Sequence, residues 1–272
     1  MNRRLRTVAA HPTRLGRIVL LSGIGIVFAI PIVSMLEFTF RVGGPGSYGL
    51  DHWLAIIDPE NERRYRTLFQ GILNSLILAG ATVTIVLVLL VPTMILVQLR
   101  VPRLQRVLEF VCIVPITVPA IVLVVGLAPV YSVVTGIFGS SAWTLAFAYG
   151  ITVLPYAYRA IYANLQTVDI VTLSEAARSL SAGWATVVLR VIVPNLKRGL
   201  LAASFISVAV VLGEFTIASL LNRNNLQTSL VQVSKSDPYA AVIFSLLSLA
   251  FASVLLIIIG RVGTAKRGKK ES

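Results

Sequence analysis

The sequence predicts an all-α, polytopic membrane protein. Hydrophobic residues make up 56% of the 272 residues and charged residues only 13%, whereas soluble domains average about 45–50% and about 25%. The mean hydropathy is +0.86. The apolar residues form runs whose lengths are close to the roughly 20 residues that a helix needs to cross a bilayer. We therefore expect one membrane domain over residues 17–260, between a cytoplasmic N-terminal segment (1–16) and a basic tail (261–272).

Apolar runs and their breaks predict six transmembrane helices. These lie at residues 17–37, 72–98, 107–131, 142–164, 196–221 and 240–260. The prolines inside these runs predict kinks, because neighbouring helices of a bundle can satisfy the backbone groups that proline frees. They are Pro31, Pro92, Pro115, Pro119 and Pro155. The first run exceeds the usual 7–15 apolar residues of a signal peptide and lacks a small-residue cleavage site, so we expect a retained span.

The basic residues predict the orientation in the membrane. The formal net charge is +13, and most of the 24 lysines and arginines fall on one side of the predicted spans. They are Arg3, Arg4, Arg6, Arg14 and Arg17; Arg100, Arg103 and Arg106; Arg159, Arg178, Arg190, Lys197 and Arg198; and Arg261, Lys266, Arg267, Lys269 and Lys270. Because positively charged loops stay in the cytoplasm, both termini are expected inside. With this hydropathy, the charge indicates membrane orientation and lipid contact, not nucleic-acid binding.

The loop at residues 38–70 is then expected outside. Its basic and acidic residues nearly balance, and the pairs Trp53-Leu54 and Leu68-Phe69 suggest short interfacial helices. Tryptophan is common at the depth of the membrane interface, so Trp53 is a candidate anchor.

Composition argues against several kinds of site. Cys112 is the only cysteine, which excludes an intrachain disulfide, and two histidines far apart, His11 and His52, do not suggest a metal site. The tail GTAKRGKK from Gly263 mimics a phosphate-binding loop. However, it lacks the Ser or Thr after the lysine and the strand before it. We expect no metal and no cofactor on this chain.

A polar segment interrupts the apolar runs between the fourth and fifth spans: TVDIVTLSEAARSLSAGWATVVLRVIVPN, residues 167–195. Leu173, Ala176, Ala177 and Leu180 follow helical spacing and predict one face of a helix. Thr172 and Glu175 have the spacing of a capping box. Gly183 is expected to end this helix, and a second helix, 184–193, to stop at Pro194. Small side chains allow close approach of another surface, so this helix–turn–helix is either a docking element or a connector.

This segment resembles the EAA motif of binding-protein-dependent ABC transporter permeases. Glu175, Ala176 and Ala177 match the motif, and Val191-Ile192-Val193-Pro194 matches its I-x-L-P-like ending. The sequence departs from the pattern at Ser181, where the family has glycine, with Gly183 two positions later. The similarity extends over the second to sixth spans and includes Leu212-Gly213-Glu214-Phe215.

The resemblance implies a permease of a bacterial plasma (inner) membrane importer. The EAA helix would couple to a cytoplasmic ABC ATPase dimer, which binds the ATP, so this chain would not itself be an enzyme. A second permease subunit, identical or sister, and an external solute-binding protein would complete the transporter. Alternating access would move the solute along the permeases. The form of the fifth span is similar to that of the spermidine/putrescine branch, with iron(III), thiamine and aminophosphonate transporters as alternatives.

Glu214 is a candidate for the solute path. A carboxylate within a membrane span is costly and usually faces a cavity or a partner. It would suit a cationic solute. The alternative explanations are a structural hydrogen bond between helices and a position near the outer interface.

Two other classes of function compete with the importer. A membrane-embedded enzyme needs clustered catalytic side chains, and the spans contain no H-E-x-x-H, G-x-S-x-G or paired carboxylate motif. A passive channel or a membrane scaffold would have no use for a helix that couples to an ATPase.

Overall fold

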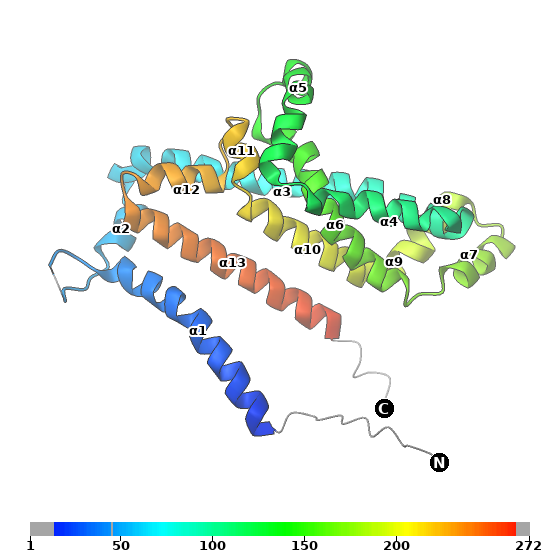
Figure 1. The fold of residues 1–272 in the computed structure, drawn as a ribbon, viewed down its shortest axis with the longest axis horizontal. Coiled ribbons are helices and arrows are strands. Elements are labelled where there is room, and N and C mark those ends of the chain that lie inside the picture. Colours follow the sequence, from blue (N-terminus) through cyan, green and yellow to red (C-terminus); the bar gives the residue numbers. More distant parts are fainter. Residues whose placement is uncertain (1–13, 45, 265–272) are drawn as a thin grey trace, which may run out of the picture.

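The computed structural model describes residues 14–44 and 46–264, and the long elements in them are helices (Figure 1). The α-helices are α1 (Arg14–Phe40), α2 (Asp51–Ile57), α3 (Glu62–Arg100), α4 (Gln105–Ile113), α5 (Ala120–Phe138), α6 (Ala146–Leu165), α7 (Ile170–Ser179), α8 (Trp184–Thr186), α9 (Val193–Asn195), α10 (Lys197–Gly213), α11 (Thr216–Leu220), α12 (Leu226–Ser234) and α13 (Pro238–Thr264). Shorter turns are η1 (Pro59–Asn61), η2 (Pro102–Leu104), η3 (Val114–Thr117), η4 (Ala142–Leu145) and the π-helix η5 (Val187–Ile192). The all-α prediction is confirmed for this part of the chain. Most of the two predicted terminal segments lies outside the described residues.

Four helices in the described residues are long and apolar enough to cross a membrane. They are α1, α3 together with η1, α5, and the Pro238–Leu255 part of α13. A fifth span results if Trp184–Asn195 and α10, which meet at 75°, are one broken span. The chain is therefore a multi-pass membrane protein.

Three of the predicted spans correspond to single helices of this set. Residues 17–37, 72–98 and 240–260 fall inside α1, α3 and α13. The predicted span 142–164 coincides with η4 and α6, and α6 is not among the candidate spans. This 20-residue helix contains four tyrosines and Arg159. The total of six spans stays a prediction.

The predicted third span, 107–131, is wrong as one continuous helix. The chain forms α4, the short turn η3 and then α5, which begins at Ala120 and runs to Phe138. Val118, which precedes Pro119, has φ −93° and ψ 121°. This break follows from proline chemistry, because a residue before proline is pushed out of the helical region towards extended backbone. Figure 1 shows α5 directed away from the line of α4.

The predicted fifth span, 196–221, is also interrupted. Helix α10 ends at Gly213, and Glu214 has extended backbone with φ −83° and ψ 122°. Helix α11 then takes a separate direction, and α12 follows after a turn in which Asn222 has φ +52°. Irregular backbone at membrane depth is tolerated where protein or a water-filled cavity surrounds it.

The main core lies where α6 packs against α3 and α10. Tyr149, Val153, Ala157 and Ile161 recur at every fourth position of α6 and are fully buried. This spacing places them on one face of the helix. A smaller core joins the first turns of α3 to α12 and α13, with Leu68 and Phe244 among its members.

The external loop is built differently from the prediction at one of its two apolar pairs. Trp53 and Leu54 lie in the short helix α2, as expected, and the Trp53 indole N–H donates to Thr39 Oγ1 at 3.2 Å. Leu68 and Phe69 do not form an interfacial helix. They belong to α3, which begins at Glu62, and Leu68 is buried in the smaller core. A separate helix at this pair is therefore a wrong prediction.

Candidate functional site

The polar segment 167–195 begins with a helix cap that the sequence pattern misassigned. Asp169 is the N-cap of α7, and its Oδ1 accepts from the Thr172 backbone N–H at 3.1 Å. Thr172 Oγ1 donates to Asp169 Oδ2 at 2.7 Å, and the hydrogen bonds from Thr172 lower the pKa of the Asp169 carboxyl. The predicted capping box of Thr172 with Glu175 is therefore wrong. An ionised carboxylate at this end also complements the positive end of the helix dipole.

Helix α7 turns one face inwards and leaves the other free. Ile170 and Ser174 are buried, and Ala177 is half-buried against the main core, with η5 packed alongside. Glu175 and Ala176 are exposed on the opposite side. The predicted apolar face is therefore shifted by part of a turn: Ala176 points away from the packed side, although Ala177 belongs to it.

The turn after α7 is closed by Ser181, not by Gly183. Ser181 has φ +62°, its N–H donates to the Arg178 carbonyl at 2.9 Å, and the Ala182 N–H donates to the Ala177 carbonyl at 3.1 Å. This pair of bonds is the Schellman motif, in which the left-handed residue is usually glycine. Gly183 has φ −67° and ψ 159°, ordinary extended backbone, and precedes α8. The predicted helix end at Gly183 is therefore corrected to Ser181.

The second helix of the segment is continuous but mixed in type. It runs through α8, the π-helix η5 and α9, so Pro194 lies inside α9 and the helix ends at Asn195 instead of stopping at Pro194. At its first residue, the guanidinium of Arg100 lies over the Trp184 ring, 5.5 Å from the centroid. This cation–π contact ties the end of α3 to the segment.

A close helix contact joins the segment's far end to the membrane domain. The Gly199 N–H of α10 donates to Asn164 Oδ1 of α6 at 3.1 Å. A Cβ added at Gly199 would lie 2.7 Å from Asn164 Cβ, so only glycine fits this contact. The contact therefore holds the start of α10, which follows the segment in sequence, closely against α6.

The free side of α7 has the chemistry of a docking surface. Val171 is 46% exposed, and the exposed charges of Glu175 and Arg178 lie four and seven positions further on the same side of the helix. Leu180, 83% exposed, is the C-cap residue just after the helix. Exposed apolar side chains next to charges are typical of a protein contact, where apolar groups supply affinity and charges set the register. Figure 1 shows α7 and α8 at the end of the molecule opposite α2.

Glu214, the other predicted site residue, lies far from this segment and performs a structural task. Both of its carboxylate oxygens accept from the Ile217 backbone N–H, at 3.0 and 3.1 Å, so it caps α11. Asn225 Nδ2 donates to the Glu214 carbonyl at 2.8 Å and to Tyr149 Oη at 3.2 Å. These contacts favour the structural explanation of the carboxylate, and a contact with solute stays a prediction.

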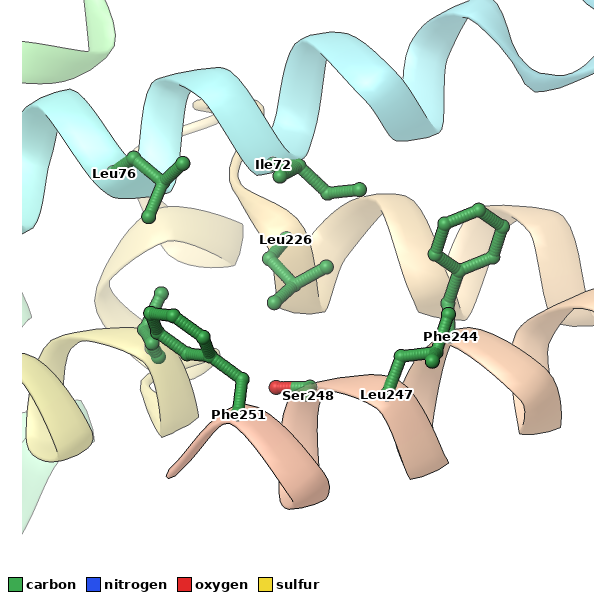
Figure 2. Close-up of a pocket in the computed structure, with 8 residues that line it drawn as sticks. Ile72, Leu76, Leu226, Phe244, Leu247, Ser248 and Phe251 are labelled. Carbon is green, nitrogen blue, oxygen red and sulfur yellow. The ribbon is translucent and has the colours of Figure 1, made fainter. Parts of the chain in front are cut away.

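The pocket in Figure 2 is apolar and offers little to a polar solute. It has a volume of about 220 Å³ between α3, α10, α12 and α13, and Ser248 is the only polar side chain among the residues drawn there. In the described part of the chain, no group of three His, Cys, Asp or Glu side chains is placed to hold a metal ion.

Sequence reasoning missed several residues of segment 167–195 and of the region around Glu214. Arg100 and Asp169 are ordinary polar residues in the sequence, and only the fold brings them to Trp184 and Thr172. The run Asn222-Arg223-Asn224-Asn225 did carry a signal, because four consecutive polar residues interrupt an otherwise apolar stretch.

Comparison with known families agrees with this architecture. Residues 94–265 match the family model described as binding-protein-dependent transport system inner membrane component. The match covers more than half of the 272 residues and includes the whole of segment 167–195. No curated protein sequence matches the chain. The chain therefore belongs to the family of inner membrane components of binding-protein-dependent transport systems, the permeases of ABC transporters.

Proposed function

We propose that this chain is the translocation subunit of an ATP-driven importer and that α7 is the helix through which a separate ATPase dimer drives it. The observation that carries the proposal is the exposed surface of α7 and its C-cap, which presents two apolar and two charged side chains: Val171, Leu180, Glu175 and Arg178. Leu180, 83% exposed just after a helix that Ser181 closes, offers this surface an apolar anchor beside two charges. ATP is bound and hydrolysed on the partner, so the chain itself is not an enzyme.

The rest of the assembly follows from the same proposal. A second permease, identical or sister, completes the translocation path, and an external solute-binding protein delivers the solute. Both termini and α7 face the cytoplasm of a bacterium, and α2 faces outwards. Of the solutes that the resemblance implies, a polyamine depends on a free carboxylate in the path, and Glu214 already caps α11. Iron(III), thiamine and an aminophosphonate remain alternatives.

A co-purification experiment tests the docking role. The tagged chain is isolated in mild detergent from cells that express the whole transporter, and the co-purified ATPase subunit and ATP hydrolysis are measured. The Leu180→Asp variant places a charge on the free side of α7 and should reduce the recovered ATPase about tenfold or more, the usual cost of a lost interface anchor.

The matched control is Leu104→Asp. Leu104 is another exposed leucine, in the turn η2 after α3 and outside segment 167–195. We expect Leu104→Asp to retain the ATPase. The docking proposal fails if Leu180→Asp and Leu104→Asp behave alike, or if the unmodified chain purifies alone and without ATP hydrolysis.

A further inference from the structure

A polar hollow of about 280 Å³ lies where the loop between α11 and α12 meets α3. Its polar lining includes Thr67 on α3, Asn222, Arg223 and Asn224 in the loop, and Thr228 and Gln232 on α12. In contrast to the apolar pocket of Figure 2, this hollow contains a charged group. Among its described lining residues there is no aspartate or glutamate.

Arg223 brings a positive charge to the hollow without a negative partner. Its Nη1 donates to the Asn222 carbonyl at 3.2 Å, while its Nε is buried and has no hydrogen-bond partner. The ion pairs among the described residues, Arg41–Glu37 and Arg64–Asp237, do not include it. Arg223 as a whole is half-buried, so its guanidinium is open to the hollow, and leaving its buried Nε–H without a partner is costly. Such a residue in a membrane protein is therefore a candidate for ligand binding.

The loop that carries Arg223 is held in place by a network of hydrogen bonds. Asn225 and Thr228 form a capping box at the start of α12. The Leu226 N–H donates to Ser75 Oγ on α3 at 2.8 Å, and Asn224 Nδ2 donates to the Thr67 carbonyl. The backbone that carries the guanidinium is therefore held in one position. A binding group that is already in place saves the ordering cost that a flexible loop would add.

The hollow lies at the end of α3 remote from the ATPase docking region. Helix α3 has 39 residues and is therefore about 58 Å long. Thr67 lies near its first turn, while Arg100 at its last residue touches Trp184. In the proposed orientation the hollow is on the outer side, where an external binding protein releases the solute.

We propose that this hollow binds an oxyanion of the transported solute (a phosphate, phosphonate or carboxylate group) and that Arg223 is its charged partner. A planar guanidinium matches two oxygens of such a group with parallel N–H donors. Asn222, whose side chain is exposed beside it, supplies a further amide donor. A polyamine would meet a like charge here. Assignment of the anion to the transported solute rests on the proposed importer function, whereas binding itself does not.

Titration calorimetry on the purified full-length chain tests the site. Methylphosphonate and inorganic phosphate are the anionic probes and spermidine is the cationic one. We expect saturable binding of an anion, no binding of spermidine, and at least about tenfold weaker anion binding by Arg223→Gln. Arg223→Lys should be intermediate, because it keeps the charge but loses the paired donors. The matched control is Lys235→Gln, which removes an exposed cation after α12 and should bind as the unmodified chain does.

A second variant covers the case in which Arg223→Gln fails to fold. Asn222→Asp places a carboxylate beside the guanidinium, and aspartate accepts the left-handed backbone of this position. It should keep the thermal unfolding temperature and lose anion binding. Equal anion affinity in the unmodified chain and in a folded Arg223 or Asn222 variant overturns the proposal, as does absence of anion binding, or binding of spermidine alone.

A lipid phosphate is the remaining source of an oxyanion. Native mass spectrometry with added phosphatidylglycerol distinguishes a lipid phosphate from the solute. If the lipid binds to the chain but free phosphate and methylphosphonate do not, the solute assignment is overturned. The same Arg223 variants are carried through the ATPase co-purification, which they should leave unchanged. Loss of the ATPase from the unmodified chain would instead contradict the importer function, so the two failures are distinguishable.

Discussion

At the scale of single residues, Ser181 adopts an unfavourable backbone conformation at the end of α7. Its φ of +62° is unfavourable for a residue with a Cβ, and glycine removes this cost. We expect Ser181→Gly to stabilise the turn by about 0.5–1 kcal/mol, after allowance for the greater freedom of glycine in the unfolded chain. Hydrogen exchange of the Ala182 amide, which bonds the Ala177 carbonyl, should slow by about two- to fivefold.

Gly183 provides the matched control for this change. Its backbone is extended and an added Cβ would have no atom within 4 Å. Gly183→Ala should therefore leave the exchange of Ala182 unchanged. If Gly183→Ala accelerated exchange while Ser181→Gly had no effect, Gly183 would be the residue that ends the helix.

The contacts of the Asp237 carboxylate predict how the stability of the fold depends on pH. Its Oδ2 accepts from Tyr65 Oη at 2.7 Å and pairs with Arg64 Nη2 at 3.3 Å, and its Oδ1 accepts from the Ala240 N–H at 3.0 Å. Burial acts to raise the pKa of Asp237, but these three partners together lower it. The pKa of aspartate in the unfolded chain is near 3.9. Because the folded pKa is lower, Asp237 stabilises the fold at pH values above the unfolded pKa, and this contribution disappears as the pH falls through the folded pKa.

The unfolding temperature in detergent should therefore be insensitive to this group between pH 5 and 8 and should decrease below about pH 4. Asp237→Asn should lower the unfolding temperature at pH 7 and reduce its dependence on acid. Asp58→Asn is the control, because Asp58 is exposed and its side chain accepts from the Glu60 N–H of the neighbouring turn η1. An Asp237→Asn variant as stable as the unmodified chain at pH 7 would contradict the role of this cluster.

Several residues show where sequence reasoning succeeded and where it could not. The polar segment 167–195 was recognisable because its composition differs from the apolar runs around it. The residue that closes α7 was not, since a serine in left-handed backbone leaves no pattern while a nearby glycine does. Likewise, Asp169 and Arg223 gain their roles from neighbours that only the fold supplies.

At the scale of elements, the contact of α6 with α10 depends on Gly199. A Cβ there would meet Asn164 Cβ at 2.7 Å and the Ala160 carbonyl at 3.2 Å. Because backbone must shift to accommodate it, Gly199→Ala should destabilise the protein by about 1–3 kcal/mol, the usual cost of overpacking. Thermal unfolding measures this loss. Gly80→Ala is the control, since Gly80 lies in α3 with open space around it and should tolerate the change.

The contact between Arg100 and Trp184 joins α3 to the proposed coupling segment. Cation–π contacts contribute about 0.5–1 kcal/mol at exposed sites, so Arg100→Gln should leave the fold intact. It should lower the amount of solute transported per ATP hydrolysed by the reconstituted transporter. Arg103→Gln, which removes an exposed charge from the neighbouring turn η2, should have no such effect. Equal transport per ATP in both variants would exclude this contact from coupling.

The breaks between elements explain why some spans were predicted and others were not. Long apolar runs that form one unbroken helix, such as those in α1 and α13, were predicted close to their observed positions. Pro119 was expected to kink a span, but it ends one helix and begins another, because Val118 is forced out of helical backbone. The interruption at Glu214 depends on its bond to the Ile217 N–H and on Asn225, which a hydropathy pattern does not record.

At the scale of the whole molecule, the helices place two surfaces at opposite ends. Helix α2 contacts the end of α1 and the start of α13, so both long helices run away from it. Helix α3 likewise begins near α2 and ends where Arg100 meets Trp184, about 58 Å away. If the chain spans the membrane, α2 and segment 167–195 must therefore face different compartments.

Cysteine labelling on intact cells tests which compartment each surface faces. The single native cysteine, Cys112, is buried and is replaced by serine to give a silent background. Glu60→Cys, in the exposed turn after α2, should react with a membrane-impermeant maleimide from outside. Ser179→Cys on α7 and Arg103→Cys in η2 should react only after the membrane is opened.

Arg103 is included because a bound ATPase would shield Ser179 but not a turn outside segment 167–195. In opened cells, Arg103→Cys should therefore react while Ser179→Cys reacts slowly. This result would support both the proposed orientation and the docking of an ATPase on α7. The reverse pattern, with Ser179 and Arg103 labelled from outside and Glu60 protected, would invert the molecule. An inverted molecule would place α7 beyond the reach of any cytoplasmic ATPase, and the proposed importer function would then be excluded.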